Sequence, residues 1–230
     1  MNNIITKTNT NILSEKVKQN LQTILNKIKG KKVFIFDLET TGLFDKKNGY
    51  KYWSNDVFNS SRIVEIGYYY SENFANSENL ENNNIIHSYL RKPTDFTSIH
   101  PEAEKKHGIS MNKLLSDGYK FSKILNSDLI KKISNCDFII SHNTDFDFSI
   151  ILNEFYRLKL FNTINYLINL RQSGGLICTC KLSGYKKLDF IYLSIFNSNP
   201  EISHRAGEDV KSLVEIILKK KLNTTFKFIL

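Results

Sequence analysis

The sequence predicts an α/β domain with one mixed five-stranded sheet, three antiparallel strands followed by parallel additions, flanked by helices. Two observations support this class. Three β-prone runs follow one another through polar links, an order typical of antiparallel neighbours. Short apolar runs then alternate with helical spacing, as in α/β folds. The expected strands are 33–36, 62–70, 85–91, 137–141 and 176–182.

The first helix is expected over residues 14–29. Apolar side chains recur there at helical spacing from Val17 to Ile28, and Gly30 is a suitable stop. We expect this helix to pack on the main domain, with partner binding as the alternative. The same spacing predicts helices at 101–107, 119–133, 146–160, 187–197 and 206–222. The predicted divisions are an N-terminal amphipathic helical extension (1–30), a main domain (31–222) and a C-terminal tail (223–230).

Composition bounds the class of protein. The chain has 230 residues, 41% of them hydrophobic, which allows a sizeable core and argues against wholesale disorder. Three Cys are too few for a disulfide framework and favour a reducing compartment. The N-terminus lacks the apolar core of a signal peptide, and no apolar run is long enough to cross a bilayer. We expect an intracellular, cytoplasmic protein without a membrane partner. The basic run 219–221 keeps a nuclear location open, although a solvated helix end is favoured.

The formal charge of +9 comes from the two ends of the chain. Residues 1–32 hold seven Lys and one acid, and residues 211–230 hold five Lys and one acid. The stretch between them has a net charge of −1. A positive excess fits an anionic partner such as nucleic acid, and a soluble protein kept off its isoelectric point is the plainer alternative.

Carboxylates stand at the ends of expected strands and at the start of a helix. Asp37 and Glu39 follow the first apolar strand, and residues two apart on a strand point to the same side. Carboxylates this close repel each other unless a cation lies between them. Asp147 stands at a strand-to-helix junction, a usual place for sites in α/β sheets. Asp209 lies in the first turns of the last long helix, five residues after His204. Solvated loop residues and helix-dipole contacts are the alternatives.

Three segments resemble the motifs of the DEDDh 3′–5′ exonucleases, the group of proofreading subunits and oligoribonucleases. They read Asp37-x-Glu39-Thr40-Thr41-Gly42-Leu43, His142-Asn143-x-x-Phe146-Asp147 and His204-x-Ala206-x-x-Asp209. The strand 62–67 and the Lys-His-Gly-Ile segment 106–109 are similar to further parts of the family pattern. The motifs occur in the order of the family, and the resemblance covers about residues 32–220.

The resemblance implies a ribonuclease-H-like fold and two divalent metal ions, Mg²⁺ or Mn²⁺. Asp37, Glu39, Asp147 and Asp209 would hold these ions through oxygen, as hard cations prefer. His204 would be the general base that acts on the attacking water, a task that suits a pKa near neutrality. The products would be nucleoside 5′-monophosphates.

The resemblance also implies substrate contacts. Thr40 and Leu43 would meet the terminal nucleotide, Thr40 through a hydroxyl or backbone N–H and Leu43 by packing on the base. His142, Asn143 and Phe146 would shape the same pocket. Core packing is the alternative for Leu43 and Phe146, and helix capping is the alternative for Asn143.

Two further segments combine aromatic and basic residues. The loop 43–61 and the turn 181–187 each admit a nucleic-acid contact. A loop folded over the domain and a solvated turn, respectively, are the favoured interpretations. The residues concerned are Lys46, Lys47, Tyr50, Lys51, Tyr52, Trp53 and Phe58 in the loop, and Lys181, Gly184, Tyr185, Lys186 and Lys187 in the turn.

We therefore predict a metal-dependent 3′–5′ exonuclease acting on single-stranded 3′ ends, with DNA favoured, in proofreading or DNA processing. RNA 3′ trimming is the alternative within the family. A catalytically inactive nucleic-acid-binding or polymerase-associated module is the alternative outside it. A polymerase partner and a homodimer both remain open. Removal of residues 1–28 is expected to weaken binding and its salt dependence while leaving the cleavage chemistry intact.

Overall fold

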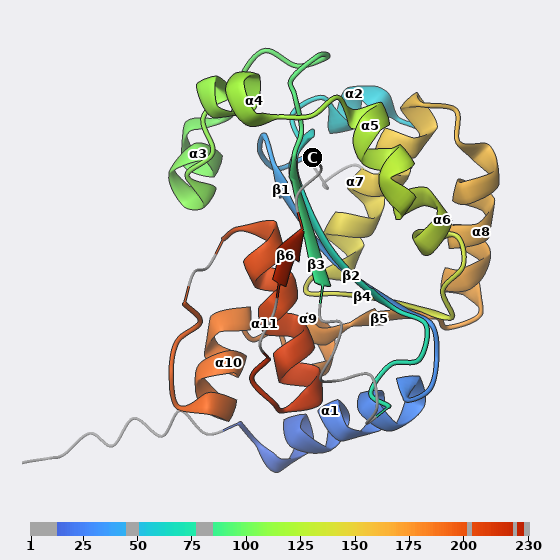
Figure 1. The fold of residues 1–230 in the computed structure, drawn as a ribbon, viewed down its shortest axis with the longest axis vertical. Helices are drawn as coiled ribbons and strands as arrows, with labels where there is room; N and C mark the ends of the chain where they lie inside the picture. Colours follow the sequence, from blue (N-terminus) through green and yellow to red (C-terminus); the bar gives the residue numbers. More distant parts are fainter. Residues whose placement is uncertain (1–12, 45–50, 77–84, 202–203, 223–224, 228–230) are drawn as a thin grey trace, which may run out of the picture.

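Six strands form one mixed sheet in the computed structural model, which describes residues 13–44, 51–76, 85–201, 204–222 and 225–227. Their spatial order is β5-β4-β1-β2-β3-β6 (Figure 1). β1, β2 and β3 pair antiparallel, whereas β4 joins β1, β5 joins β4 and β6 joins β3 in parallel. The strands are β1 (Val33–Thr40), β2 (Ile63–Ser71), β3 (Ile85–Leu90), β4 (Phe138–Ser141), β5 (Leu176–Cys178) and β6 (Thr225–Lys227).

The five strands expected from the sequence are present, and the prediction of a mixed α/β sheet is confirmed. β6 is an addition, because it forms within the segment 223–230 that was expected to be a tail. The rest of that segment and residues 1–12 of the predicted extension lie outside the described residues. The last predicted strand, 176–182, is too long: it ends at Cys178, and a helical turn follows.

Helices lie on both faces of the sheet (Figure 1). Predicted helices are confirmed with small shifts at their ends, and α2, α4, α8 and α9 are additions. Among the described residues, no helix combines the length and the apolar character needed to cross a bilayer. The helices are α1 (Glu15–Ile28), α2 (Asn55–Phe58), α3 (Pro101–His107), α4 (Met111–Asp117), α5 (Phe121–Ile124), the π-helical turn η2 (Leu125–Leu129), α6 (Ile130–Ile133), α7 (Thr144–Arg157), α8 (Phe161–Gln172), α9 (Thr179–Leu182), α10 (Leu188–Phe196) and α11 (Ala206–Leu218).

Two hydrophobic cores, one on each face of the sheet, follow from the alternation of β1. Phe34, Phe36 and Leu38 point into the first core, against the helices from α5 to α8. Val33 and Ile35 point into the second core, against α1, α10 and α11. The sheet is therefore the middle layer of three, and both of its faces are covered.

The helix α1 is an integral part of the second core. Ser14 caps it, and Val17, Leu21, Ile24 and Ile28 are buried against the body of the protein. The prediction that this helix packs on the main domain is confirmed. Removal of residues 1–28 would expose the second core to water. We therefore expect this removal to affect the stability of the protein as well as its binding of nucleic acid.

The loop after β1 is partly folded onto the body, as the favoured interpretation expected. Phe58 is fully buried and Tyr52 packs against the first core. Trp53 remains 47% exposed, with the Lys51 ammonium 5.3 Å from its ring centroid. Lys46, Lys47 and Tyr50 lie outside the described residues.

Candidate active site

The first two carboxylates owe their positions to the strand β1. Val33 and Ile35 point into the second core, so Asp37 and Glu39 lie on that same face farther along the strand. The register against β2 shifts after Glu39, where regular pairing ends. Glu39 is buried, whereas Asp37 keeps partial exposure; both line a cleft of about 990 Å³.

The turn after β1 is held in place by His107 of the segment 106–109. Its Nδ1 accepts the backbone N–H of Ile109 at 3.0 Å, so Nε2 carries the proton and donates to the carbonyl of Thr40 at 3.2 Å. Burial lowers the pKa of His107 and favours this neutral form. The Thr40 hydroxyl donates to the carbonyl of Gly42 within the same turn. Thr40 therefore shapes the turn, and its hydroxyl is already used there.

Asp147 is positioned by α7, which is anchored in its last turn by a buried carboxylate that pairs with two arginines. Glu154 accepts from Arg62 and Arg91, both at 2.7 Å. Asp147 and Glu154 lie two helical turns apart on one face of α7, and both are buried. The helix follows β4 directly, which brings Asp147 to the edge of the sheet where β1 ends.

Asp209 is brought to β1 by the close contact of α11 with β2. The Glu65 carboxylate accepts from the Arg205 guanidinium at 2.8 and 2.9 Å and from the backbone N–H of Ala206 at 3.0 Å. A side chain on Gly67 would overlap the carbonyl group of Ala206. The start of α11 can therefore lie against β2 because Glu65 accepts its backbone N–H and because Gly67 has no side chain.

The four carboxylates converge in the cleft. Oxygens of Asp37, Glu39 and Asp209 lie within 4.8 Å of one another. Asp147 is close enough for its charge to raise the pKa of Asp37. Its Oδ2 is buried without a hydrogen-bond partner in the described part of the chain. A buried carboxylate oxygen with no donor is costly, and a hard divalent cation would satisfy it through the oxygen ligands present here. The residues therefore fit such an ion.

The pKa values of all four carboxyl groups are raised. Burial is the largest cause, and it raises the pKa of Glu39 to about 8 and that of Asp209 to about 7. The pKa values of Asp37 and Asp147 also lie well above the ordinary range, through burial and then neighbouring carboxylates. Lys106 opposes these shifts at each of the four groups.

His204 lines the same cleft from the segment before α11. It is half-buried, and its backbone has the left-handed value φ 60°. This conformation is unusual for a residue other than glycine and is found often at functional sites. Burial, and next the charge of Lys106, lower the pKa of its imidazole. At neutral pH the ring is therefore mostly neutral and able to accept a proton.

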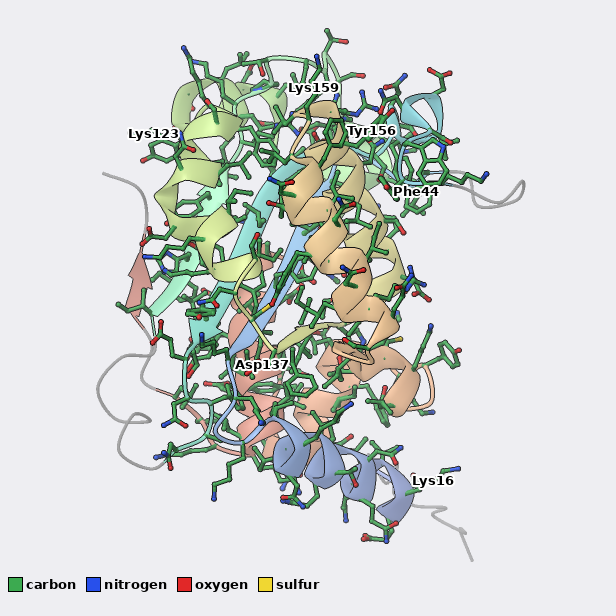
Figure 2. All side chains as sticks on the ribbon, turned by 90° about the vertical axis from the view of Figure 1, so that its right-hand side faces the viewer. Lys16, Phe44, Lys123, Asp137, Tyr156 and Lys159 are labelled. Atoms are coloured by element: carbon green, nitrogen blue, oxygen red, sulfur yellow. The ribbon has the colours of Figure 1, made fainter. Side chains whose placement is uncertain are left out.

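Aromatic and aliphatic side chains form one wall of the cleft. Leu43 is 79% exposed there, so it belongs to the cleft and not to the core. Phe146 is half-buried and stacks on buried Phe44, with ring centroids 5.3 Å apart. Phe146 thus combines the two interpretations, since it both packs on a core residue and lines the cleft. Figure 2 shows Phe44 at the edge of the molecule.

His142 and Asn143 lie at the junction of β4 and α7 and also line the cleft. The ring nitrogens of His142 are both engaged, with the Thr179 hydroxyl at 2.9 Å and the Lys186 carbonyl at 3.0 Å. This residue therefore ties the segment after α9 to the end of β4. Asn143 occupies the N-cap position of α7 with φ 74°, but its side chain makes no capping bond and is exposed.

Several residues at the site are not among those predicted from the sequence. Lys106, Phe44 and Asp189 line the cleft, and Glu65 holds α11 from below. Lys106 and Glu65 lie inside segments that resemble the family pattern, which was the available signal. Asp189 offered no such signal, because it lies at the start of α10 outside every motif.

Comparisons with known proteins agree with this geometry. The Exonuclease family model, RNase_T, matches residues 34–217, which is most of the chain. No curated protein sequence matches. A solved exonuclease I, studied for its processivity, is 15% identical over 82% of this chain and 40% of that chain, with a TM-score of 0.54. The zinc-bound form of an E. coli ExoI–ssDNA complex is 16% identical over 81% of this chain and 39% of that one, with a TM-score of 0.57.

The chain spans about two fifths of the length of these two neighbours, and at this identity the likeness concerns the fold. The family match and the buried acidic cluster together indicate the use of divalent metal. The chain therefore belongs to the exonuclease family, as a nuclease of the DEDDh type with the ribonuclease-H-like fold.

Proposed function

We propose that the chain is a metal-dependent 3′–5′ exonuclease that releases nucleoside 5′-monophosphates from single-stranded 3′ ends. The observation that carries this proposal is the convergence of Asp37, Glu39, Asp147 and Asp209 in one cleft together with His204. An inactive binding module would have no need to gather four mutually repelling carboxylates in one cleft.

The residues have distinct tasks in this reaction. Asp37, Glu39, Asp147 and Asp209 would hold two divalent ions, Mg²⁺ or Mn²⁺. When bound, such ions lower the pKa of water and stabilise the charge on the leaving oxygen. His204, neutral at pH 7, accepts the proton of the attacking water at an imidazole nitrogen.

The remaining cleft residues position the substrate. Leu43 is exposed in the wall and packs on the terminal base, and Phe146 supports it from the same side. The exposed Asn143 amide faces the cleft as a hydrogen-bond donor and acceptor. Lys106, from α3, offers a positive charge to the phosphate beside the carboxylates.

DNA is the favoured substrate. It is supported by the single-stranded DNA held in the structurally similar ExoI complex. Proofreading or DNA processing inside the cell is the role that we propose for this activity. A polymerase or a second copy of the chain as partner remains a prediction from the sequence.

The test uses the full chain and end-labelled single strands of DNA and RNA with one base sequence. We expect stepwise shortening from the 3′ end with Mg²⁺ or Mn²⁺ and none with EDTA. Asp147→Asn should abolish it, and His204→Ala should slow it about 10²–10⁴-fold, the usual value of a general base.

Asp137→Asn is the matched control. Asp137, labelled in Figure 2, is exposed and precedes β4. Asp147 follows that strand, on α7. Replacement of Asp137 should leave the rate unchanged. Absence of shortening on both polymers would refute the proposal, and faster loss of RNA would make RNA trimming the activity.

A further inference from the structure

Two grooves continue the catalytic cleft toward α1. The first, of about 580 Å³, shares Lys186 with the cleft and lies between the start of α1 and the turn after α9. The second, of about 460 Å³, shares Asn20, Lys181 and Leu182 with the first and runs on between α1, β5 and α8. The three hollows therefore lie next to one another on the surface, in a series from the cleft to α1.

This series of hollows is basic. Five cationic residues line the two grooves against one carboxylate, Asp145, which pairs with Lys181 at 2.6 Å and with Arg171 at 3.6 Å. The net charge of the groove lining is therefore +4. Lys187 extends the series into the cleft. We define the basic track as Lys16, Lys27, Arg171, Lys181, Lys186 and Lys187, all exposed.

An exposed tyrosine stands where the cleft passes into the first groove. Tyr185 is 75% exposed and has φ 61°, a left-handed conformation that is strained for a residue with a side chain. Its ring has no aromatic partner among the described side chains. Its backbone is nevertheless fixed, because its N–H donates to Cys180 at 2.8 Å and the next carbonyl accepts from His142. A strained, rigidly held and exposed ring is suited to stacking on a base.

The helix α1 is a rigid side of the two grooves. Its apolar face is buried, and the Asn20 amide donates to the carbonyl of Leu182 at 2.8 Å. Lys16 and Lys27 stand about 16 Å apart along the helix axis. In Figure 2, Lys16 and the cleft residue Phe44 both lie toward the right-hand side, Lys16 near the lower end of the molecule and Phe44 near the upper end. The family match begins only at residue 34, so α1 is outside the shared domain.

We propose that the basic track binds the single strand that leads into the cleft, with its phosphates on the lysines and Arg171 and one base on Tyr185. This proposal rests on the proposed exonuclease function. The 3′ end lies at the carboxylates, and the preceding nucleotides pass Tyr185 and continue along α1. The rigidity of α1 gives the enzyme a binding surface that the catalytic domain alone does not have.

The test compares strands of about four and about sixteen nucleotides, the range of site sizes known for single-strand-binding proteins. Binding to the full chain is measured in EDTA, so that the strands stay intact. Replacement of Lys16 and Lys27 by Gln should weaken the long strand about two- to fivefold per lysine. It should also lower the salt slope by about 0.7 for each lost phosphate contact. The preference for the long strand should shrink accordingly.

The matched control is the replacement of Lys120 and Lys131 by Gln. Both lysines are exposed: Lys120 directly precedes α5 and Lys131 lies on α6. These helices cover the face of the sheet opposite to α1, so the two replacements should not affect binding of the strand. Tyr185→Asn tests the stacking contact, because Asn tolerates a positive φ and keeps the turn. It should weaken the long strand, whereas Tyr185→Trp should retain the affinity.

Two failures can be distinguished. If the wild-type protein shortens neither the DNA nor the RNA strand in Mg²⁺ or Mn²⁺, the proposed function itself is wrong. If it does so, but the Lys16 and Lys27 replacements bind the long strand as the control does, only the basic track is refuted. In that case an acidic protein would be the better candidate partner for the positively charged basic track.

Discussion

Single residues carry the chemistry of this site, and repulsion among four of them is its central property. Burial raises the pKa of Glu39 to about 8 and that of Asp209 to about 7, and Lys106 offsets only part of this effect. The protein without metal must therefore either hold protons on these groups or bear their repulsion. A bound dication removes both costs.

The stability of the metal-free protein should accordingly fall as the pH rises. The pKa of Glu39 is 4.5 in its ordinary state and about 8 here, so the folded protein keeps a proton that the unfolded chain releases between these values. More protons on the folded state mean that stability declines with increasing pH. We expect the melting temperature in EDTA to fall from about pH 5 to pH 8, and Mg²⁺ to raise it most at the upper end.

Asp209→Asn supplies the comparison for this measurement. It removes one of the groups with a raised pKa, so the decline with pH should become shallower. Asp137→Asn, away from the cleft, should retain the wild-type slope. A melting temperature in EDTA that rises over this pH range would contradict the raised pKa values.

Secondary-structure elements bring these residues together, and the contact between α11 and β2 is the most demanding. Glu65 binds the N-terminus of α11, and Gly67 allows the backbone of Ala206 to approach β2. The sequence motifs contain both residues but do not show what they touch. Asp209 reaches β1 only because α11 lies directly on the sheet.

Gly67→Ala should displace α11 and loosen the metal site. The added methyl group would overlap backbone atoms that cannot rotate away, and overpacking of this kind costs about 1–3 kcal/mol. We expect a lower melting temperature together with weaker Mn²⁺ binding, measured by calorimetry. Gly174→Ala is the control: it strains a residue with φ 76° but meets no atom within 4 Å, and lies outside the cleft. It should lower stability alone.

At the scale of the whole molecule, the positive charge is concentrated at the two ends of the chain. The segment 33–210 carries a net charge of −1, which two bound dications would turn to +3, whereas the ends carry the excess of lysine. The lysines of α1 are held in fixed positions, because they lie on a helix whose opposite face is buried in the second core.

Removal of residues 1–28 should therefore destabilise the protein as a whole. Four buried side chains of α1 would be lost, and burial of such side chains contributes about 1.5–3 kcal/mol each. Their sum is comparable with the total stability of a typical domain. We expect the truncated chain to be aggregated or to melt far below the full chain, as measured by circular dichroism. A truncated chain with an unchanged melting temperature would show that α1 is dispensable.

The sequence by itself determined the class of sheet, the main helices and the order of the acidic motifs, because these depend on local periodicity and on residue type. Asp37 and Glu39 could be placed on one face from their spacing alone. The tertiary structure decided how α11 meets β2, why Lys106 faces the carboxylates, and that His142 serves as a tie to Lys186. It also added β6 and ended β5 at Cys178. Such features depend on contacts between segments far apart in the chain, which leave no periodic signal in the sequence.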